Sequence, residues 1–322
     1  MNTVLTYHSM LAAEMDRFVA FKRMQGYDYT DQARTLSYFD RFLVAEEQQA
    51  PGRHLRLDTL ERYVATTAYL PAYSRKTRLA SLRQFSRYLH ARYPDSVVLP
   101  KDILPRHRRT IRFCRIEPEE VVEMMAATAT ILPSDGIRAR SIGVLIGLLY
   151  STGLRIGEAL NLTLGNIEPD CSILHAVKGK FSKKRLVPMS PSTLRALTRY
   201  LADRERHAST SSSSPLFIGA YNTALTYAQV SHAFRRLCRH CGVRGDPPPR
   251  LHDLRHNYAC RVLTLWRQAG MDINALLPVL ATAMGHVKIF DTQIYLHIDA
   301  VALQDAADTF KSHITTHQEL IK

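Results

Sequence analysis

The chain has 322 residues, of which 46% are hydrophobic and 22% charged, proportions typical of a soluble globular protein with room for two cores. No apolar run approaches the roughly 18 residues that a membrane span needs. Lys and Arg outnumber Asp and Glu by 43 to 29, and the resulting charge of +14 favours nucleic acid as partner over an acidic membrane surface, because phosphates neutralised by cations release condensed counterions.

The N-terminal segment and the cysteines indicate the compartment. The first 21 residues carry Glu14 and Asp16 inside an apolar run and lack a basic start, so we expect no signal peptide. The five cysteines are an odd number, and their spacing does not suggest a disulfide framework. Both observations predict a cytoplasmic protein without membrane partners.

Residues 8–93 show the apolar spacing of several helices. The first has Leu11, Met15 and Phe18 three or four residues apart and ends at Gly26, and the second follows Asp31 as a plausible N-cap. A third, short helix precedes a longer one over "SRKTRLASLRQFSRYLHARYP", which Pro94 ends. The sequence therefore predicts a helical domain over residues 1–100.

Basic residues gather on the last of these helices and in the segment after it. The helix carries four cations outside its apolar face: Arg75, Lys76, Arg83 and Arg87. They form either a solvated face or phosphate contacts, and the net charge favours phosphate. Residues 101–117 contain prolines that forbid a continuous helix, together with the arginines Arg106, Arg108 and Arg109. We predict an extended, basic linker that also contacts DNA.

A second domain is predicted over residues 118–322. It starts with a helix at Pro118, contains the core helix "SIGVLIGLLYSTG", and includes two β-prone arms, residues 171–177 and 185–189, around the basic tip "KGKFSKK". The expected fold class is mainly α with a small antiparallel β-sheet or hairpin.

Four separated segments contain side chains able to bind a phosphate. "STGLRIGEALNL" carries Arg155 and Glu158; "VKGKFSKKRLVP" carries Lys180; "LHDLRHNYA" carries His252 and Arg255 on one helix face; and "MGHVKIFDTQIYLH" carries His286 and Tyr295. Each alone is compatible with a structural role. The ordered combination is far more specific.

In this order the segments resemble the hallmark boxes of the tyrosine recombinase (phage integrase) family, including its Xer-type resolvases, over residues 118–310. The resemblance implies a C-shaped DNA clamp with a SAM-like core-binding domain, the basic linker and a catalytic domain. It assigns the nucleophile to Tyr295, with Arg155, Lys180, His252, Arg255 and His286 as catalytic partners and Glu158 as supporting acid.

These residue types suit DNA strand transfer. About one unperturbed tyrosine in a thousand is ionised at neutral pH, so a bare phenol forfeits roughly 4 kcal/mol of barrier. Arg155 and Arg255 can hold the non-bridging oxygens, and Lys180 can protonate the leaving 5′ oxygen. His252 is a candidate general base or phosphate donor, and His286 a second donor. The resulting 3′-phosphotyrosine stores the bond energy, so we expect neither metal, ATP nor another cofactor.

Several alternatives remain for individual residues. Tyr150 and Tyr258 are rival nucleophiles, and Lys178 and Lys183 are rivals of Lys180. His256 follows Arg255 directly and is expected to pack in the core. A zinc site is also conceivable, with the ligand spacing of Cys238, Cys241, His252 and His256.

The predicted function is site-specific DNA recombination through a Holliday junction, with a type IB-like topoisomerase or an inactive DNA-binding protein as alternatives. The resemblance implies a tetramer on two sites, in which the helix after Tyr295 packs on the neighbouring protomer; partner recombinases are also conceivable. Residues 260–285 are longer than in compact relatives and resemble integrases of transposons and other mobile elements. The target sequence is encoded by no motif.

Overall fold

The structure of the chain is a computed structural model that describes residues 5–46, 54–103, 113–133, 137–168, 170, 172–176 and 185–297. The chain divides into two compact units, Met1–Thr110 and Ile111–Lys322. This division falls inside the predicted linker. Residues 104–112, and with them Arg106, Arg108 and Arg109, lie outside the described residues.

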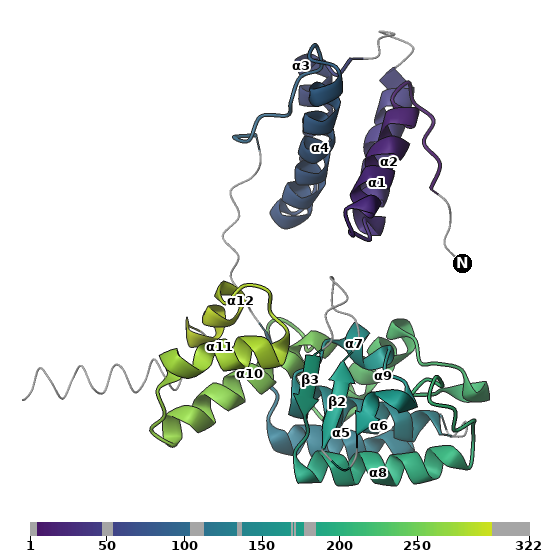
Figure 1. The fold of residues 1–322 in the computed structure, drawn as a ribbon, viewed down its shortest axis with the longest axis vertical. Helices are drawn as coiled ribbons and strands as arrows, with labels where there is room; N and C mark the ends of the chain where they lie inside the picture. The colour runs from purple at the N-terminus through teal and green to yellow at the C-terminus, as the bar shows by residue number, and fades with distance from the viewer. Residues whose placement is uncertain are drawn as a thin grey trace, which may run out of the picture. The chain divides into compact units, whose positions relative to one another are not determined.

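The first unit is helical, as predicted. Its elements are α1 (Ala12–Met24), α2 (Thr30–Glu46), α3 (Leu57–Thr66) and α4 (Ala72–Arg92) (Figure 1). Helix α4 packs against α1 and α2. Phe18, Phe39 and Phe85 are almost fully buried between these helices, and the rings of Phe18 and Phe85 lie 5.5 Å apart. Burial of such aromatic side chains is the main stabilising contribution to a domain of this size.

The second unit contains the remaining elements. In chain order they are α5 (Pro118–Ile131), α6 (Arg138–Thr152), α7 (Ile156–Leu160), η1 (Leu164–Asn166), β1 (Ile167–Glu168), β2 (Ile173–Ala176), β3 (Arg185–Pro188), α8 (Pro191–Glu205), η2 (Ala220–Asn222), α9 (Tyr227–His240), α10 (Leu251–Gln268), α11 (Ile273–Met284), α12 (Phe290–Gln293) and η3 (Ile294–His297). Among the described residues no helix is long and apolar enough to cross a bilayer.

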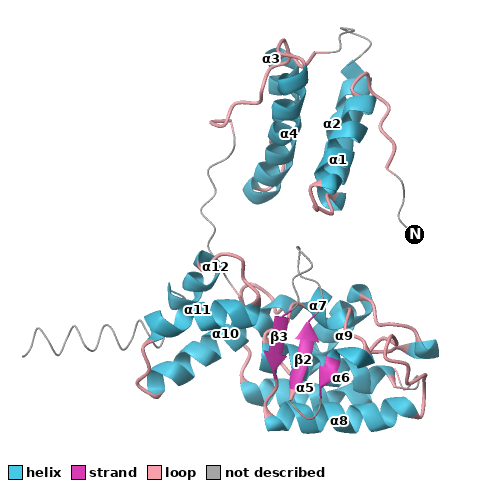
Figure 2. Ribbon diagram, viewed as in Figure 1, coloured by secondary structure: helices cyan, strands magenta, loops and turns pink. Residues whose placement is uncertain are grey.

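The sheet has three antiparallel strands in the order β1-β2-β3 (Figure 2). Leu174 of β2 pairs with Val187 of β3, and both side chains are buried. The predicted hairpin arms are therefore confirmed. The tip of the hairpin, residues 177–184 with Lys180, lies outside the described residues. The two-residue strand β1 was not predicted, because so short a strand leaves no periodicity in the sequence.

The core of the second unit surrounds α6, which packs against α5, α8 and α10. This helix was predicted as a core helix, and its side chains from Leu145 to Leu149 are largely buried. Residues 113–117, assigned above to the linker, belong to this unit: Cys114 and Ile116 are buried. Their backbone N–H groups donate to Asp253 and Asn257 of α10, so the chain is fixed to this helix.

The long segment 260–285 forms the second half of α10 and all of α11. These helices share a separate small core that includes Leu263, Leu280 and Met284, and Tyr295 lies in the same core. The segment therefore holds the short elements α12 and η3 in place.

We predict that Arg204→Ala lowers the free energy of unfolding of the second unit by about 3 kcal/mol. Arg204 is 1% exposed and donates to the carbonyls of Ser209, Pro215 and Leu216. The substitution removes these donors from Ser209 and Pro215 and leaves the buried Leu216 carbonyl with the Tyr200 hydroxyl as its donor. Fluorescence of Trp266, the one tryptophan of the chain, reports unfolding of this unit in urea.

The matched control is Arg206→Ala, because the Arg206 side chain is 75% exposed. We expect its effect to stay within roughly 0.5 kcal/mol. Equal effects of the two substitutions would contradict a structural role for Arg204.

Candidate active site

The C-terminal end of α11 is the centre of the site. Gly285 follows the helix in the left-handed region (φ 67°), and its N–H donates to the Thr282 carbonyl at 2.9 Å. The N–H of His286 donates to the Ala281 carbonyl at 2.9 Å. This Schellman-type ending satisfies two carbonyls of the last turn and leaves those of residues 283–285 open to other donors.

Three arginines from three different elements bind these three consecutive carbonyls. Arg185, at the start of β3, donates to Ala283 at 2.6 Å. Arg255 of α10 donates to Met284 at 2.7 Å, and Arg155, which precedes α7, donates to Gly285 at 3.0 Å. Cations near the negative end of a helix are favourable. The helix end thus gathers three guanidinium groups in one place.

Glu158 connects two of these arginines. Its carboxylate is 4% exposed and accepts from Arg185 at 2.7 Å and from the side chain and backbone of Arg155, each at 2.9 Å. Burial alone raises the pKa of Glu158, but the charges of Arg185 and Arg155 and the backbone hydrogen bond hold it below its ordinary value. Glu158 therefore stays ionised and orients both guanidinium groups.

Arg255 and Arg155 differ in their access to solvent. Arg255 is 2% exposed and also donates to the carbonyl of Gly153. Burial, and next the charge of Arg155, lower the pKa of Arg255 to about 9, so the group remains protonated at neutral pH. The side chain of Arg155 is 38% exposed. It can therefore meet a ligand that arrives from solvent.

Two histidines lie near the arginines. His252 is exposed in the first turn of α10, and desolvation by the surrounding protein and the charge of Arg255 lower its pKa. Burial, and next Arg255 and Arg155, lower the pKa of His286 to about 3. Nδ1 of His286 lies 2.7 Å from Oγ1 of Thr292, which fixes the ring. His286 is therefore neutral at neutral pH.

Tyr295 lies inside the same unit, with its side chain 2% exposed. Its hydroxyl lies 2.9 Å from Nδ1 of His256. Its ring is nearly parallel to that of His286, at an interplanar angle of 9° and a centroid distance of 6.5 Å. Its side chain packs in the same small core as Leu280 and Met284 of α11, the helix whose end binds the three arginines.

The comparison with known proteins agrees with this arrangement. Residues 114–301, more than half of the chain, match the model of the phage integrase family. The chain belongs to the phage integrase family. The resemblance to Xer-type recombinases and integrases is confirmed, and the protein is an enzyme of the tyrosine recombinase type.

Relatives of this recombinase match over much of their length. The chain is 31% identical to the integrase/recombinase y4rE of Sinorhizobium fredii over 91% of this chain and 94% of that one. It is 29% identical to the tyrosine recombinase XerC of Chlamydia caviae over 69% of this chain and 67% of that one. The Tn1549 transposon integrase, solved in complex with transposon right end DNA, has a TM-score of 0.60 at 15% identity over 91% of this chain and 98% of that one, which shows a shared fold.

The structure brings six residues singled out from the sequence of the recombinase into one place: Arg155, Glu158, His252, Arg255, His286 and Tyr295. Two neighbours were missed. Arg185 follows two lysines of the hairpin tip and was not separated from that basic run. His256 was expected to serve core packing; it is buried, at 6% exposure, but it also contacts the Tyr295 hydroxyl.

The alternatives have different surroundings. The Tyr150 hydroxyl donates to the Ile116 carbonyl, whereas the ring of Tyr258 packs against Gly153, and burial raises the pKa of Tyr258 against the opposing charges of Arg185 and Arg255. Lys178 and Lys183 lie outside the described residues. Within the described ranges no three His, Cys, Asp or Glu side chains form a group that could hold a metal. Cys238 instead packs against Met124 in the core, with 3.7 Å between the two sulfurs.

The cations predicted to contact DNA on α4 have different environments. Arg87 is exposed, whereas Arg75, Lys76 and Arg83 are half-buried. Nε of Arg75 donates to Thr67, and Nε of Arg83 is buried without a hydrogen-bond partner.

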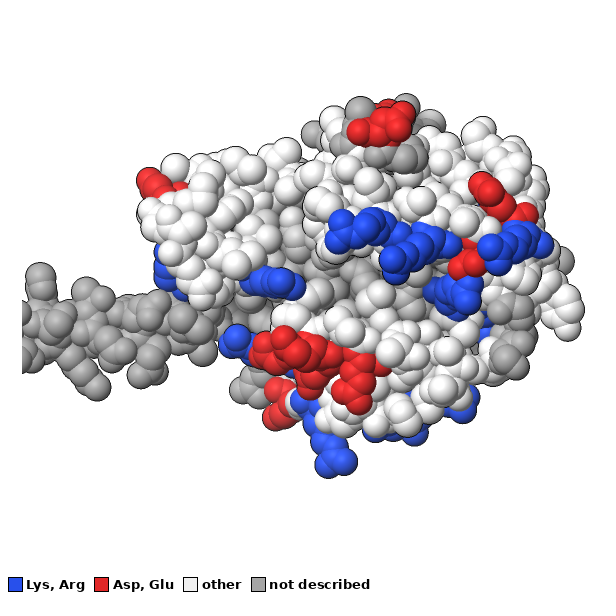
Figure 3. Space-filling model, turned by 90° about the horizontal axis from the view of Figure 1, so that it is seen from below, with Lys and Arg blue, Asp and Glu red and all other residues white. Residues whose placement is uncertain are grey.

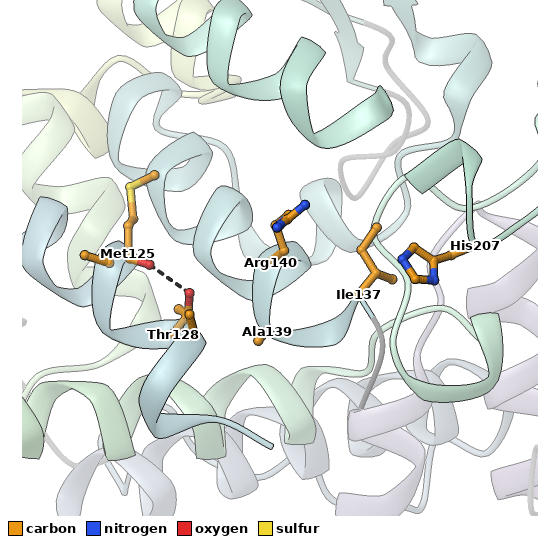
Figure 4. A pocket seen from close by; sticks show the side chains of 8 residues that line it. Met125, Thr128, Ile137, Ala139, Arg140 and His207 are labelled. Carbon is orange, nitrogen blue, oxygen red and sulfur yellow. Dashed lines mark hydrogen bonds between the residues drawn. The ribbon is translucent and has the colours of Figure 1, made fainter. Parts of the chain in front are cut away.

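Two further features of the recombinase surface are a charged face and a pocket. On the face shown in Figure 3, basic side chains form a row and acidic ones a compact group. A pocket of about 430 Å³ lies beside α5 and α6, with Met125, Thr128, Arg140 and His207 among its lining residues (Figure 4). It contains none of the six gathered residues.

We predict that Gly285→Ala destabilises the second unit by about 2 kcal/mol and slows any reaction at the site. The substitution strains a left-handed backbone, and the new Cβ would lie 2.6 Å from Nε of Arg185, whose side chain is held by two hydrogen bonds. Urea unfolding followed by Trp266 fluorescence measures the effect.

Gly157→Ala is the control, because a Cβ at that position meets nothing within 4 Å. It should leave stability unchanged or raise it by up to about 1 kcal/mol. A Gly285→Ala variant as stable as the wild type would contradict the geometry of this helix end.

We also predict that His286 makes the second unit sensitive to mild acid. Its pKa is about 3 when folded and near 6.5 when unfolded, so the unfolded state binds a proton first as the pH falls. The contribution of the neutral His286 side chain to the free energy of unfolding is complete above pH 6.5 and is lost progressively as the pH falls towards 3. His286→Gln should therefore lose less unfolding free energy than the wild type between pH 7 and 5, whereas a variant of the exposed His240 should match the wild type.

Proposed function

We propose that this recombinase cuts and rejoins DNA at specific sites through a covalent 3′-phosphotyrosine bond to Tyr295. The observation that supports this most directly is the position of the Tyr295 hydroxyl, which lies 2.9 Å from Nδ1 of His256 in a small core shared with α11. The end of the same helix, α11, gathers three guanidinium groups, and His286 follows it directly.

The arrangement suits phosphoryl transfer. The side chains of Arg155 and His252 are exposed and can bind the non-bridging oxygens of the phosphate. Arg255 is buried, and its positive charge stabilises the phosphate without exposure to solvent. His286, a neutral imidazole at neutral pH, can donate from its second nitrogen. Lys180, on the hairpin between β2 and β3, is proposed to protonate the leaving 5′ oxygen.

The groups present make the chemistry independent of metal and ATP. Charge that develops on the phosphate is met by guanidinium groups, and the phosphotyrosine bond preserves the energy of the phosphodiester. A 5′-hydroxyl from another strand reverses the step, and two successive exchanges pass through a Holliday junction.

The proposed assembly is a tetramer on two DNA sites, with the residues after His297 packing on the neighbouring protomer. Arg75, Lys76, Arg83 and Arg87 of α4, and Arg106, Arg108 and Arg109 of the predicted linker, are proposed to contact the DNA backbone. The shared fold with a transposon integrase, together with the α10–α11 segment, supports the ends of a mobile element as the natural substrate.

The proposal is tested with nicked duplexes that tile the DNA on both sides of the gene. Cleavage beside the nick releases a short fragment and traps the protein–DNA adduct, which a denaturing gel detects. The wild type should form the adduct with an added chelator and without ATP, and Tyr295→Phe should form none, because the attacking oxygen is missing.

Tyr258→Phe is the matched control and should retain the adduct. An adduct that persists in Tyr295→Phe would overturn the assignment of the nucleophile. Plasmid relaxation by a monomer, without exchange between two duplexes, would favour the topoisomerase alternative.

A further inference from the structure

The imidazole of His256 is held rigidly against the phenol of Tyr295. His252 and His256 are four residues apart on α10 and therefore lie on one face of the helix. The ring of His252 meets that of His256 edge-on at 4.6 Å, and Phe113 lies over it at 5.3 Å. With the Tyr295 ring on a further side, the His256 side chain is enclosed by three rings and is 6% exposed.

The other histidines of the site are less well placed to receive the phenolic proton. Nδ1 of His286 is engaged with Thr292, and the centroid of its ring lies 6.5 Å from that of Tyr295. His252 is exposed, and its ring contacts that of His256, which in turn contacts the ring of Tyr295. Nδ1 of His256 lies 2.9 Å from the hydroxyl oxygen, within the range needed for direct proton transfer.

We propose that His256 is a further catalytic residue, which accepts the proton of Tyr295 when the phenol attacks DNA. This inference rests on the proposed function. A neutral phenol donates to Nδ1, which leaves the imidazole proton on Nε2. Both side chains are nearly inaccessible to solvent in the free protein, so Nδ1 of His256, and not bulk water, is the neighbour of the phenolic proton there.

The O–H bond of Tyr295 breaks and its proton moves to Nδ1 of His256, while the bond from the phenolic oxygen to phosphorus forms. The bond from phosphorus to the 5′ oxygen breaks, and the leaving oxygen takes a proton from a separate acid, the role proposed for Lys180. In rejoining, the imidazolium of His256 returns its proton to the phenolate as Tyr295 leaves.

Two substitutions separate proton transfer from positioning. In His256→Asn the amide oxygen replaces Nδ1 as hydrogen-bond acceptor but does not take up a proton near neutral pH, whereas His256→Ala removes both properties. We expect His256→Asn to form the adduct about 100-fold more slowly than the wild type at pH 7 in single turnover, with unchanged DNA affinity. Its rate should rise about tenfold per pH unit towards the pKa of the phenol.

His252→Asn is the matched control on the same helix. It should be slower than the wild type because a phosphate contact is lost, but it should retain the pH dependence of the wild type. Replacement of Tyr295 by 3,5-difluorotyrosine, a more acidic phenol, should restore much of the rate of His256→Asn and little of that of His252→Asn.

The outcomes are distinguishable. A His256→Asn variant with wild-type rate and pH profile, or a His256→Ala variant faster than the wild type, overturns the role of His256 while leaving Tyr295 as nucleophile. Absence of an adduct from the wild type on DNA that it binds overturns the proposed function, and with it this inference. Histidine ¹⁵N spectra give a second readout: the Nδ1 signal of His256 should shift in Tyr295→Phe, and an unchanged signal contradicts the hydrogen bond.

Discussion

The end of α11 is the feature on which the rest of the site depends. A helix leaves its last carbonyls without partners, and here two are satisfied by the backbone of Gly285 and His286 while three accept from Arg185, Arg255 and Arg155. Because these arginines come from β3, α10 and the start of α7, one helix end fixes the relative positions of three distant parts of the chain. His286 follows directly and takes its position from the same ending.

The arginine cluster at the end of α11 carries more positive than negative charge. Three guanidinium groups meet at the helix end, the buried carboxylate of Glu158 pairs with two of them, Arg155 and Arg185, and the charge of Arg155 disfavours the protonated form of Arg255. The same excess positive charge adds to burial in keeping His286 neutral. A bound phosphodiester supplies the missing charge, so DNA completes the electrostatics of the site.

Much of this site was predictable because short segments carry it. Arg155 and Glu158 belong to one box and His252 and Arg255 to another, so local spacing already places each pair on one element. Arg185 was not predictable, since only its contact with the α11 end distinguishes it from the lysines before it. For His256 the expectation of a core position was accurate, but the sequence did not reveal that this part of the core contains Tyr295.

The locked helix end also determines where the fold tolerates changes in length. An insertion between Ala283 and Gly285 would shift every carbonyl past its guanidinium group. By contrast, the turn between α10 and α11 contains Gly270. A Cβ atom added to this glycine would meet no other heavy atom within 4 Å. Evolution can therefore lengthen the α10–α11 hairpin at this turn, away from the arginines, and relatives with hairpins of different lengths can keep the same register at the helix end.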